Sequence, residues 1–362
     1  MRVERVESIV EFEALAEAWS DLADRSDTAH LFNTHAWLSA WWEAFGRGTP
    51  RVYAVYDDRL VAALPLRLDD RGLTAWFNHY LGRSDVLVDR DRPDAYPALF
   101  AALGDDRADW DHVELTQVPE DSPTIAALAR GDADPLRIHA VRNICSPYLL
   151  CRGTYDAWYK SRFSGRKRQQ DRRKLRQAEK RGATELVWHT DVEAVQAAFE
   201  RGAIAEDKSW KGEEASAMLK SPDALAFMRD VIVRFAKLGA VRLVEQTVGG
   251  ETAAFLLGFV HGDTFYFHKT GYDPEFADVS PGRTVLLAAI ERCFEEGLAR
   301  FDFLGADDPY KLECSPLVRP HVIAFVYHRG LRSRMLREQK RLVPKVRALR
   351  GEPIAFPVRL DR

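Results

Sequence analysis

The stretch 263–304 constrains the fold of this chain more than any other part of its sequence. It begins with an aromatic-rich, alternating run at 263–268, which is typical of a packed strand. Residues 280–283, Ser-Pro-Gly-Arg, then offer an N-cap and a proline suited to the first position of a helix. Gly297 is typical of the residue just past a helix end, and 301–304 predicts a second buried strand. The stretch therefore predicts a strand–helix–strand unit.

When two such strands are parallel, the start of the helix and the exit of the second strand meet at one edge of a sheet. Unpaired backbone N–H groups and the positive end of the helix dipole attract anions there. Ser280 is the predicted N-cap, Gly282 lets a ligand approach the backbone closely, and Arg283 can pair with a phosphate. The alternative is a helix cap and a packing glycine without a ligand, and the residues alone leave both interpretations open.

The segment 280–311, SPGRTVLLAAIERCFEEGLARFDFLGADDPYK, resembles the carboxyl-terminal signature of the CelD/BcsL-type acyltransferases of the GNAT superfamily. In the front half, Trp-x-x-x-Trp-Trp before Phe-Gly at 37–46, Leu-Pro-Leu at 64–66 and Ser-Asp at 84–85 are similar to the same family. The back half is also similar to the FemAB-type peptidyltransferases, which use aminoacyl-tRNA as the donor. The resemblance covers about 30–330 and implies an α/β fold of GNAT-like modules with mixed sheets.

The resemblance also implies the donor site. The implied donor is acyl-CoA, for example acetyl-CoA, with its pyrophosphate on the helix that starts at Ser280, Gly282 and Arg283. The sequence departs from the Q/R-x-x-G-x-G/A form of this loop that is common in GNAT enzymes, which puts the use of CoA in question. No metal is expected, because the four cysteines show no metal-binding spacing.

N-acyl transfer also needs a deprotonated amine and a stabilised oxyanion. The resemblance to FemAB-type enzymes implies that the aromatic–Lys pair Tyr310 and Lys311 lies near the reacting centre. Tyr310 is then the candidate proton donor to the leaving group, and Lys311 the candidate oxyanion or phosphate ligand. Asp302 is a candidate base or orienting group, and an end-of-strand hydrogen bond explains it equally well.

Other candidates lie outside this segment. His268 ends the first strand and can relay a proton, although a strand histidine is more often structural. Trp210, with Lys208 just before it, is a candidate to line the acceptor cleft. Asp85 either contacts substrate or caps a turn, and the cap is the favoured interpretation.

Both halves of the chain follow the order helix–helix–hairpin–strand–helix–strand, which predicts two tandem GNAT-like modules joined by a basic helix. Ser146-Pro147-Tyr148 is expected to break the chain before this helix, which we predict as one continuous helix ending near 182. The predicted parts are an amino-terminal module at 1–145, a linker with the basic helix at 146–182, a carboxyl-terminal catalytic module at 183–330 and a basic amphipathic tail at 331–362.

The net charge of −3 hides two basic segments. Residues 160–181 hold eleven Lys or Arg against two acidic residues, and 327–362 hold eleven against three. Because like charges four residues apart repel, a merely solvated helix at 160–181 is the weaker explanation. We expect the segments 160–181 and 329–350 to contact tRNA or an anionic membrane, with docking on the protein itself as the simplest role for the tail.

The predicted function is transfer of an acyl group from acyl-CoA to an amine of a sugar, a lipid or a cell-envelope or polysaccharide precursor. The first alternative is a FemAB-like ligase that takes an amino acid from aminoacyl-tRNA, and the second is a non-catalytic module that binds polyanions or membranes. Absence of HExxH, GxGxxG, Walker and GxSxG motifs counts against metalloproteases, dinucleotide enzymes, NTPases and typical hydrolases. No apolar run of membrane-spanning length or signal peptide is present, so a cytoplasmic location, with or without membrane association, is expected.

Overall fold

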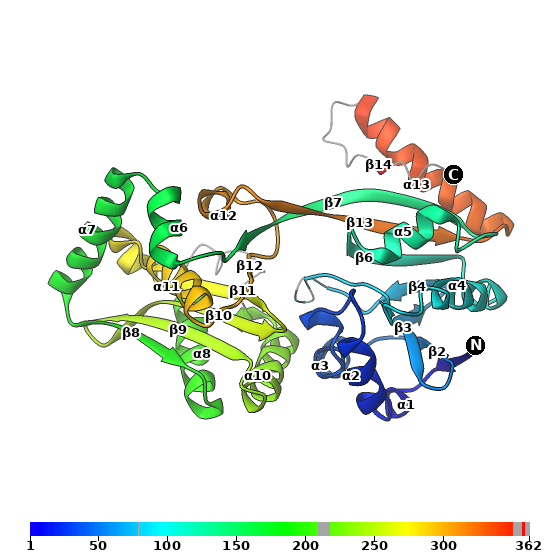
Figure 1. Ribbon diagram of the computed structural model, residues 1–362, viewed down its shortest axis with the longest axis horizontal. Coiled ribbons are helices and arrows are strands. Elements are labelled where there is room, and N and C mark those ends of the chain that lie inside the picture. Colours follow the sequence, from blue (N-terminus) through cyan, green and yellow to red (C-terminus); the bar gives the residue numbers. More distant parts are fainter. Residues whose placement is uncertain (79, 81, 209–217, 350–356, 359–362) are drawn as a thin grey trace. The chain divides into compact units, whose positions relative to one another are not determined.

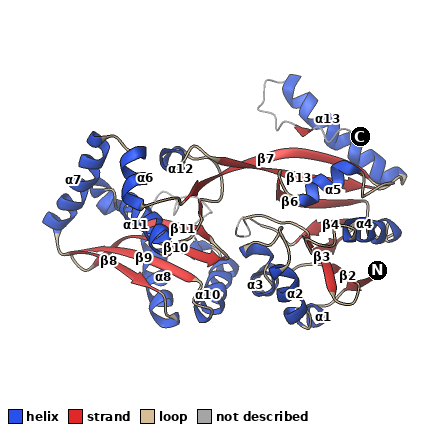
Figure 2. Cartoon of the chain, viewed as in Figure 1, coloured by secondary structure: helices blue, strands red, loops and turns tan. Residues whose placement is uncertain are grey.

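The structure is a computed structural model that describes residues 1–78, 80, 82–208, 218–349 and 357–358. It divides into two compact units, which Figures 1 and 2 show with their helices and strands: unit 1 comprises Met1–Cys145 and Arg319–Arg362, and unit 2 comprises Ser146–Val318. The chain passes from unit 1 into unit 2 within strand β7 and returns within strand β13. The predicted boundary after residue 145 coincides with the end of the first segment of unit 1.

Unit 1 is a mixed sheet with helices packed on it. Its strands follow the order β1-β2-β3-β4-β6-β13-β7, with β5 beside β3 and β14 beside β7. Strands β4 and β6 pair in parallel, and α4 lies between them in the sequence. Its elements are β1 (Arg2–Val6), α1 (Ile9–Glu13), α2 (Ala16–Asp24), η1 (Leu31–Asn33), α3 (His35–Phe45), β2 (Thr49–Tyr56), β3 (Leu60–Asp69), β4 (Gly72–Ala75), β5 (Leu87–Val88), α4 (Ala95–Asp105), β6 (His112–Pro119), α5 (Pro123–Arg130), the first part of β7 (Arg137–Leu150), β13 (Val318–Tyr327), α13 (Leu331–Leu349) and β14 (Pro357–Val358).

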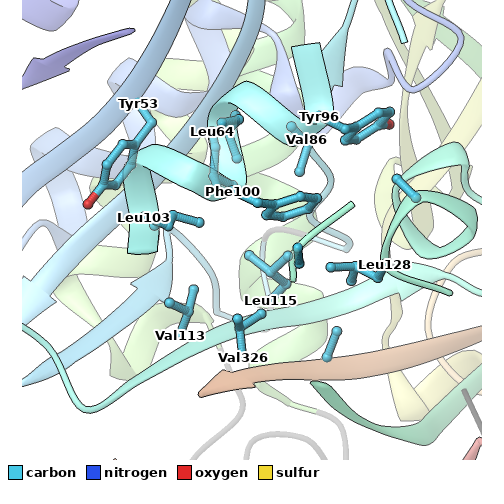
Figure 3. Packing of buried hydrophobic residues seen from close by; sticks show 14 of the residues in the cluster. Tyr53, Leu64, Val86, Tyr96, Phe100, Leu103, Val113, Leu115, Leu128 and Val326 are labelled. Carbon is cyan, nitrogen blue, oxygen red and sulfur yellow. The ribbon is translucent and has the colours of Figure 1, made fainter. Parts of the chain in front are cut away.

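The core of unit 1 lies between α4 and the sheet. Figure 3 shows Phe100 and Leu103 of α4 among aliphatic side chains from the strands, including Leu115 of β6 and Val326 of β13. All four side chains are almost completely buried. Because burial of one such side chain contributes roughly 1.5–3 kcal/mol, this layer accounts for much of the stability of the unit.

Unit 2 has the same plan. Its strands follow the order β7-β12-β11-β10-β9-β8, and β11 and β12 are parallel and joined through α11. Its elements are the last part of β7, α6 (Tyr155–Arg162), α7 (Gly165–Arg181), β8 (Thr184–His189), α8 (Val192–Asp207), η2 (Met218–Lys220), α10 (Pro222–Lys237), β9 (Val241–Val248), β10 (Glu251–His261), β11 (Thr264–Tyr272), η3 (Pro274–Val279), α11 (Pro281–Glu295), β12 (Arg300–Asp302) and α12 (Pro309–Cys314). The predicted strand–helix–strand unit and the mixed α/β fold are confirmed.

Helices cover both faces of the sheet in unit 2. Val244 of β9 belongs to the apolar cluster formed with α11, whereas its neighbour Glu245 binds Arg201 of α8. Successive residues of a strand point to opposite faces, so α11 and α8 lie on opposite sides of the sheet. Gly297, with φ 69°, directly follows the C-cap residue of α11, as predicted.

Each unit receives a strand from the other half of the sequence. The end of β7 pairs with β12 in unit 2, through Tyr148 and Asp302, and β13 pairs with β6 in unit 1, through Phe325 and Glu114. The structure therefore places 319–330 in unit 1 rather than with the predicted carboxyl-terminal module, and it places 146–182 in unit 2 rather than in a separate linker.

Two local predictions in the connecting segment are wrong. Pro147 does not break the chain, since β7 continues through it while its carbonyl oxygen accepts a hydrogen bond from the Phe303 N–H at 3.0 Å. The basic segment is not one helix, because Phe163 is extended and Ser164 begins α7 by accepting a hydrogen bond from the Lys167 N–H. Phe163 is buried in the apolar cluster of unit 2, and this anchoring explains the break.

The tail helix α13 docks on unit 1. Its Arg332 lies 2.9 Å from the Asp111 carboxylate, and its Lys340 ammonium lies 4.5 Å from the centre of the Phe325 ring. Ser333, which is fully buried, accepts a hydrogen bond from the backbone N–H of His328. Of the contacts expected for the tail, docking on its own protein is therefore observed.

Candidate functional site

A pocket of about 740 Å³ lies in unit 2 where β11 extends past its parallel partner. The ladder between β11 and β12 contains three residue pairs and ends at Tyr266 and Asp302, while β11 continues to Tyr272. Because β12 ends before β11, the edge of the sheet is open beside the start of α11. The walls come from the end of β11, the first turn of α11 and the segment 308–313.

The backbone at the start of α11 forms one wall of the pocket. Ser280 is the N-cap residue of α11, as predicted, but it has φ 55° and ψ 52° and its side chain makes no capping hydrogen bond. The physical reason is that Ser280 also ends η3, and its left-handed backbone makes the corner between η3 and α11. Pro281 has no N–H, so Gly282, which lines the pocket, provides the first amide of the helix.

Gly282 leaves this amide accessible. A Cβ atom at this position would lie 3.7 Å from Cδ1 of Tyr272, which is an ordinary contact distance. The backbone φ of Gly282 is also outside the left-handed region. Neither packing nor backbone conformation therefore requires a glycine at this position.

The Arg283 side chain is engaged within the protein. Its Nε and Nη2 atoms bind the two carboxylate oxygens of Asp171 on α7 at 2.7 and 3.0 Å, and its Nη1 lies 3.3 Å from Glu313. The guanidinium also stacks 4.6 Å above the Phe163 ring. Arg283 thus lines the pocket, but its charge is balanced by two carboxylates, and it ties α11 to α7.

Tyr310 contributes a phenol to the pocket wall. It lies on α12, lines the pocket and is 44% exposed. Desolvation, and secondarily the charge of Asp308, raise the pKa of its phenol above the usual value. Tyr310 therefore remains protonated at neutral pH and can donate a proton or a hydrogen bond into the pocket.

Lys311 and Asp302 both hold the loop that follows β12. The buried Lys311 ammonium donates to the carbonyl oxygens of Leu304 and Ala306 at 2.9 and 3.1 Å and lies 2.9 Å from the Asp308 carboxylate. Asp302 is 3% exposed and accepts a hydrogen bond from the Leu304 N–H at 3.0 Å. These contacts match the end-of-strand alternative for Asp302. Lys311 lines the pocket together with Tyr310, and the same contacts give it a structural role there.

The other predicted site residues lie elsewhere. His268 is the extra residue of a β-bulge between β10 and β11 and packs edge-on against Phe259, with ring centres 5.6 Å apart. Asp85, in unit 1, accepts hydrogen bonds from the hydroxyls of Ser122 and Thr124 at 2.6 and 2.5 Å, at the start of α5. Asp85 therefore holds the start of α5 through these two hydroxyls, while Ser122 itself is the N-cap residue of that helix. Trp210 lies outside the described residues.

Several pocket residues were not predicted from the sequence. Thr270 and Tyr272 line the pocket from β11, and the bulge at His268 sets which residues of the strand face it. Asp171, the partner of Arg283, is one of only two acidic residues in the basic run 160–181, and that isolation is a signal in the sequence. The bulge leaves no comparable signal.

Helix α7 presents two different faces. One face is held to unit 2 through the buried Ala178 and through ion pairs of Asp171 with Arg283 and of Arg181 with Asp278. The other face exposes a stripe of basic residues at helical spacing, and no carboxylate of the described residues forms an ion pair with any of them. These residues are Arg166, Arg172, Arg173, Arg176 and Lys180.

Two features, a metal-binding cluster and a membrane-spanning helix, are absent from the described part of the chain. Among the residues that the structure describes, no three His, Cys, Asp or Glu side chains are grouped so that they could hold a metal ion. In the same part of the chain, no helix combines the length and the apolar character needed to cross a bilayer.

The pocket lies at the open edge of a strand–helix–strand unit, the arrangement predicted from the sequence. Comparison with known families agrees, since residues 165–312 match the family described as an acetyltransferase (GNAT) domain. The matched residues lie within unit 2, and the match confirms the predicted GNAT-like fold. A search of curated protein sequences gives no match to the chain.

Solved structures share the fold over nearly the whole chain. FemX is 14% identical, with 90% of this chain and 97% of that chain covered and a TM-score of 0.59. A conserved protein of unknown function from Bacteroides thetaiotaomicron VPI-5482 is 13% identical, with 90% and 100% covered and a TM-score of 0.56. L-PGS from Bacillus licheniformis is 12% identical, with 88% and 94% covered and a TM-score of 0.55. At these identities the similarity establishes the fold.

Proposed function

We propose that the chain is a CelD/BcsL-type N-acyltransferase that moves an acyl group from acyl-CoA to an amine of a sugar, a lipid or a cell-envelope precursor. The observation that carries this proposal is the pocket, because it joins an accessible helix start at Gly282 to a protonated phenol at Tyr310. Its volume of about 740 Å³ lies within the range of about 300–1,000 Å³ that is usual for small-molecule sites.

The residues divide the work as follows. The Gly282 amide at the start of α11 is suited to bind an oxygen of the donor pyrophosphate, because the helix dipole adds to its hydrogen bond. The next two amides, of Arg283 and Thr284, already donate to the Ser280 carbonyl oxygen at 3.2 and 3.3 Å. Bound acyl-CoA supplies the activated acyl group. Tyr310 is suited to donate its proton to the leaving sulfur when the amine nitrogen attacks the acyl carbon and the carbon–sulfur bond breaks. Arg283 positions α11 through Asp171.

A ligand series tests this donor site. Acetyl-CoA, longer acyl-CoAs and free CoA are expected to raise the melting temperature, since a ligand at a hundred times its dissociation constant stabilises by about 2.7 kcal/mol. S-acetyl-pantetheine, which carries the thioester but no pyrophosphate, is the matched control and is expected to bind far more weakly. Absence of a shift with every thioester would contradict the proposal.

The basic face of α7 favours one alternative, a FemAB-like ligase that takes its amino acid from aminoacyl-tRNA. Contacts of this face with RNA phosphates would release counterions, so affinity for charged tRNA should fall steeply between 50 and 200 mM salt. The charge reversals Arg173→Glu and Arg176→Glu should weaken that binding and flatten its salt dependence. Lys237→Glu, at an exposed lysine of α10, is the control. Equal binding by all three variants would exclude this role for α7.

The tail helix supports association with an anionic membrane. Leu331, Met335 and Leu342 are 75%, 65% and 53% exposed at helical spacing, and the exposed Arg334 and Arg341 lie beside them. An apolar stripe flanked by arginines is typical of a helix that lies at a lipid interface.

Vesicle co-sedimentation tests the tail helix. The protein should sediment with phosphatidylglycerol vesicles more than with phosphatidylcholine vesicles, and Leu331→Ser with Met335→Ser should reduce this difference. Leu238→Ser, at a 70% exposed leucine of unit 2, is the control. Binding through α7 or α13 without any thioester ligand or turnover would instead indicate a non-catalytic binding module.

A further inference from the structure

Two thiols of unit 2 lie in contact outside the pocket. The Sγ atoms of Cys151 and Cys293 are 3.3 Å apart, although the two residues are separated by 142 positions in the sequence. Cys293 is completely buried on α11, and Cys151 is half-buried just beyond the end of β7. A disulfide bond is about 2.05 Å long, so the two sulfur atoms need to approach by only about 1.2 Å.

Regular structure holds both cysteines in place. The backbone N–H of Cys151 donates to the carbonyl oxygen of Ala299 at 2.9 Å, directly after the β7–β12 ladder pair of Leu150 with Arg300. Cys293 packs in the apolar cluster between α11 and the sheet. The contact between the thiols is therefore set by the sheet and the helix rather than by a loop.

We propose that Cys151 and Cys293 form a redox modification site that a peroxide converts into an intrachain disulfide. The sulfur of Cys151 attacks one oxygen of hydrogen peroxide, the O–O bond breaks, and a sulfenic acid and hydroxide result. The sulfur of Cys293 then attacks that of Cys151, the S–O bond breaks, and hydroxide leaves. Two thiols and one peroxide thus yield one disulfide and two waters, with two electrons passing from sulfur to oxygen.

The surroundings assign the first step to Cys151. Its half-buried position lets a small oxidant reach the sulfur, whereas Cys293 is covered. The hydrogen bond with Cys151, and after it burial, raise the pKa of the Cys293 thiol, so Cys293 keeps its proton until it acts as the resolving thiol. Asp263 and Glu296 act on Cys293 in the same direction through their charge.

The crosslink would fasten α11 to the chain just before α6. Because it closes a loop of 142 positions, its effect on the unfolded chain is large, and the melting temperature of unit 2 should rise by roughly 10–20 °C. Cys293 lies ten residues along α11 from Arg283, or about 15 Å at 1.5 Å per residue. Binding of acetyl-CoA at the helix start should therefore change less than twofold.

The test treats the full chain with hydrogen peroxide and maps the peptides by mass spectrometry without reduction. We expect one peptide pair that joins Cys151 to Cys293, a higher melting temperature, and reversal of both by dithiothreitol. Cys145→Ser, at the other half-buried cysteine, should leave the crosslink intact, whereas Cys151→Ser and Cys293→Ala should each abolish it.

Three results would overturn the proposal: unmodified thiols at 151 and 293, oxidation directed to Cys145 or Cys314, or disulfides formed only between molecules. Cys151→Ser changes a half-buried position and should fold even when Cys293→Ala does not, so the test does not depend on the core variant.

Discussion

Replacement of Gly282 by alanine tests whether the glycine at the start of α11 serves the fold or the binding of an anionic ligand. The added Cβ atom meets nothing nearer than Cδ1 of Tyr272 at 3.7 Å, and the backbone φ is one that alanine adopts. Alanine is favoured over glycine inside a helix by up to about 1 kcal/mol. For a unit of this size the melting temperature should therefore stay unchanged or rise by up to about 4 °C.

Donor binding should respond in the opposite direction. The methyl group would lie beside Tyr272, where both residues line the pocket, and would keep an anion from the first amide of α11. Loss of one hydrogen bond to a charged group costs about 1.5–3 kcal/mol, which corresponds to a rise of about 10- to 150-fold in the dissociation constant. Titration calorimetry with acetyl-CoA measures this change directly.

Gly104→Ala is the matched control for this experiment. Gly104 is also helical, has no left-handed φ, and would place its Cβ 3.9 Å from Cδ2 of Leu136, in unit 1. It should show a similar gain in stability with no change in affinity. Equal affinity of the Gly282→Ala variant and the natural protein would refute an anion site at this amide, and a lower melting temperature would show that the fold needs the glycine.

Three further predictions concern Asp85, Lys311 and Tyr310. Burial raises the pKa of Asp85 to about 6 in the folded protein, so its contribution to stability is complete below pH 4 and is lost as the pH rises to about 6. Asp85→Asn should remove this pH dependence, which amounts to a difference of the order of 3 kcal/mol in the free energy of unfolding. Urea unfolding curves measured at pH 4 and pH 7 give that difference. Lys311→Met should lower the free energy of unfolding by about 2 kcal/mol, because it leaves two carbonyl oxygens without their donor. Normal stability with lost turnover would instead assign the Lys311 ammonium to the substrate. Tyr310→Phe should lower kcat by about 100-fold with unchanged acetyl-CoA affinity, and an unchanged kcat would remove Tyr310 as the acid.

The sequence predicts those elements of the fold that depend on local physics. Pro281 and Gly297 mark the two ends of α11 because each suits one end of a helix, and the structure confirms both ends. Strand pairing is not local. The apolar pattern of 321–330 predicts a strand, which the structure shows as β13, but nothing in it indicates that the partner is β6, some 200 residues earlier in the chain. For that reason the strand was expected in the wrong unit.

The same limit applies to the candidate site. Gly282 and Tyr310 were predicted from one short segment, and they do share a pocket. The contacts of Arg283 and Lys311 could not be predicted, because their partners are set by tertiary structure. Asp171 lies 112 positions before Arg283, and the carbonyl groups that bind Lys311 belong to a loop whose path depends on the buried Asp302.

The ion pair of Arg283 changes how its mutation should be interpreted. From the sequence, Arg283 is the cation of the helix start, and loss of ligand binding in Arg283→Ala would place the phosphates there. In the structure the same change removes the ion pair between α7 and α11 and leaves the 14% exposed Asp171 carboxylate with the Tyr159 hydroxyl, at 2.7 Å, but without its cation. Binding would then be lost through displacement of the pocket wall, whether or not the side chain contacts the donor. Gly282 makes no such side-chain contact. Gly282→Ala therefore tests binding of the donor, whereas Arg283→Ala mainly tests the integrity of the pocket wall.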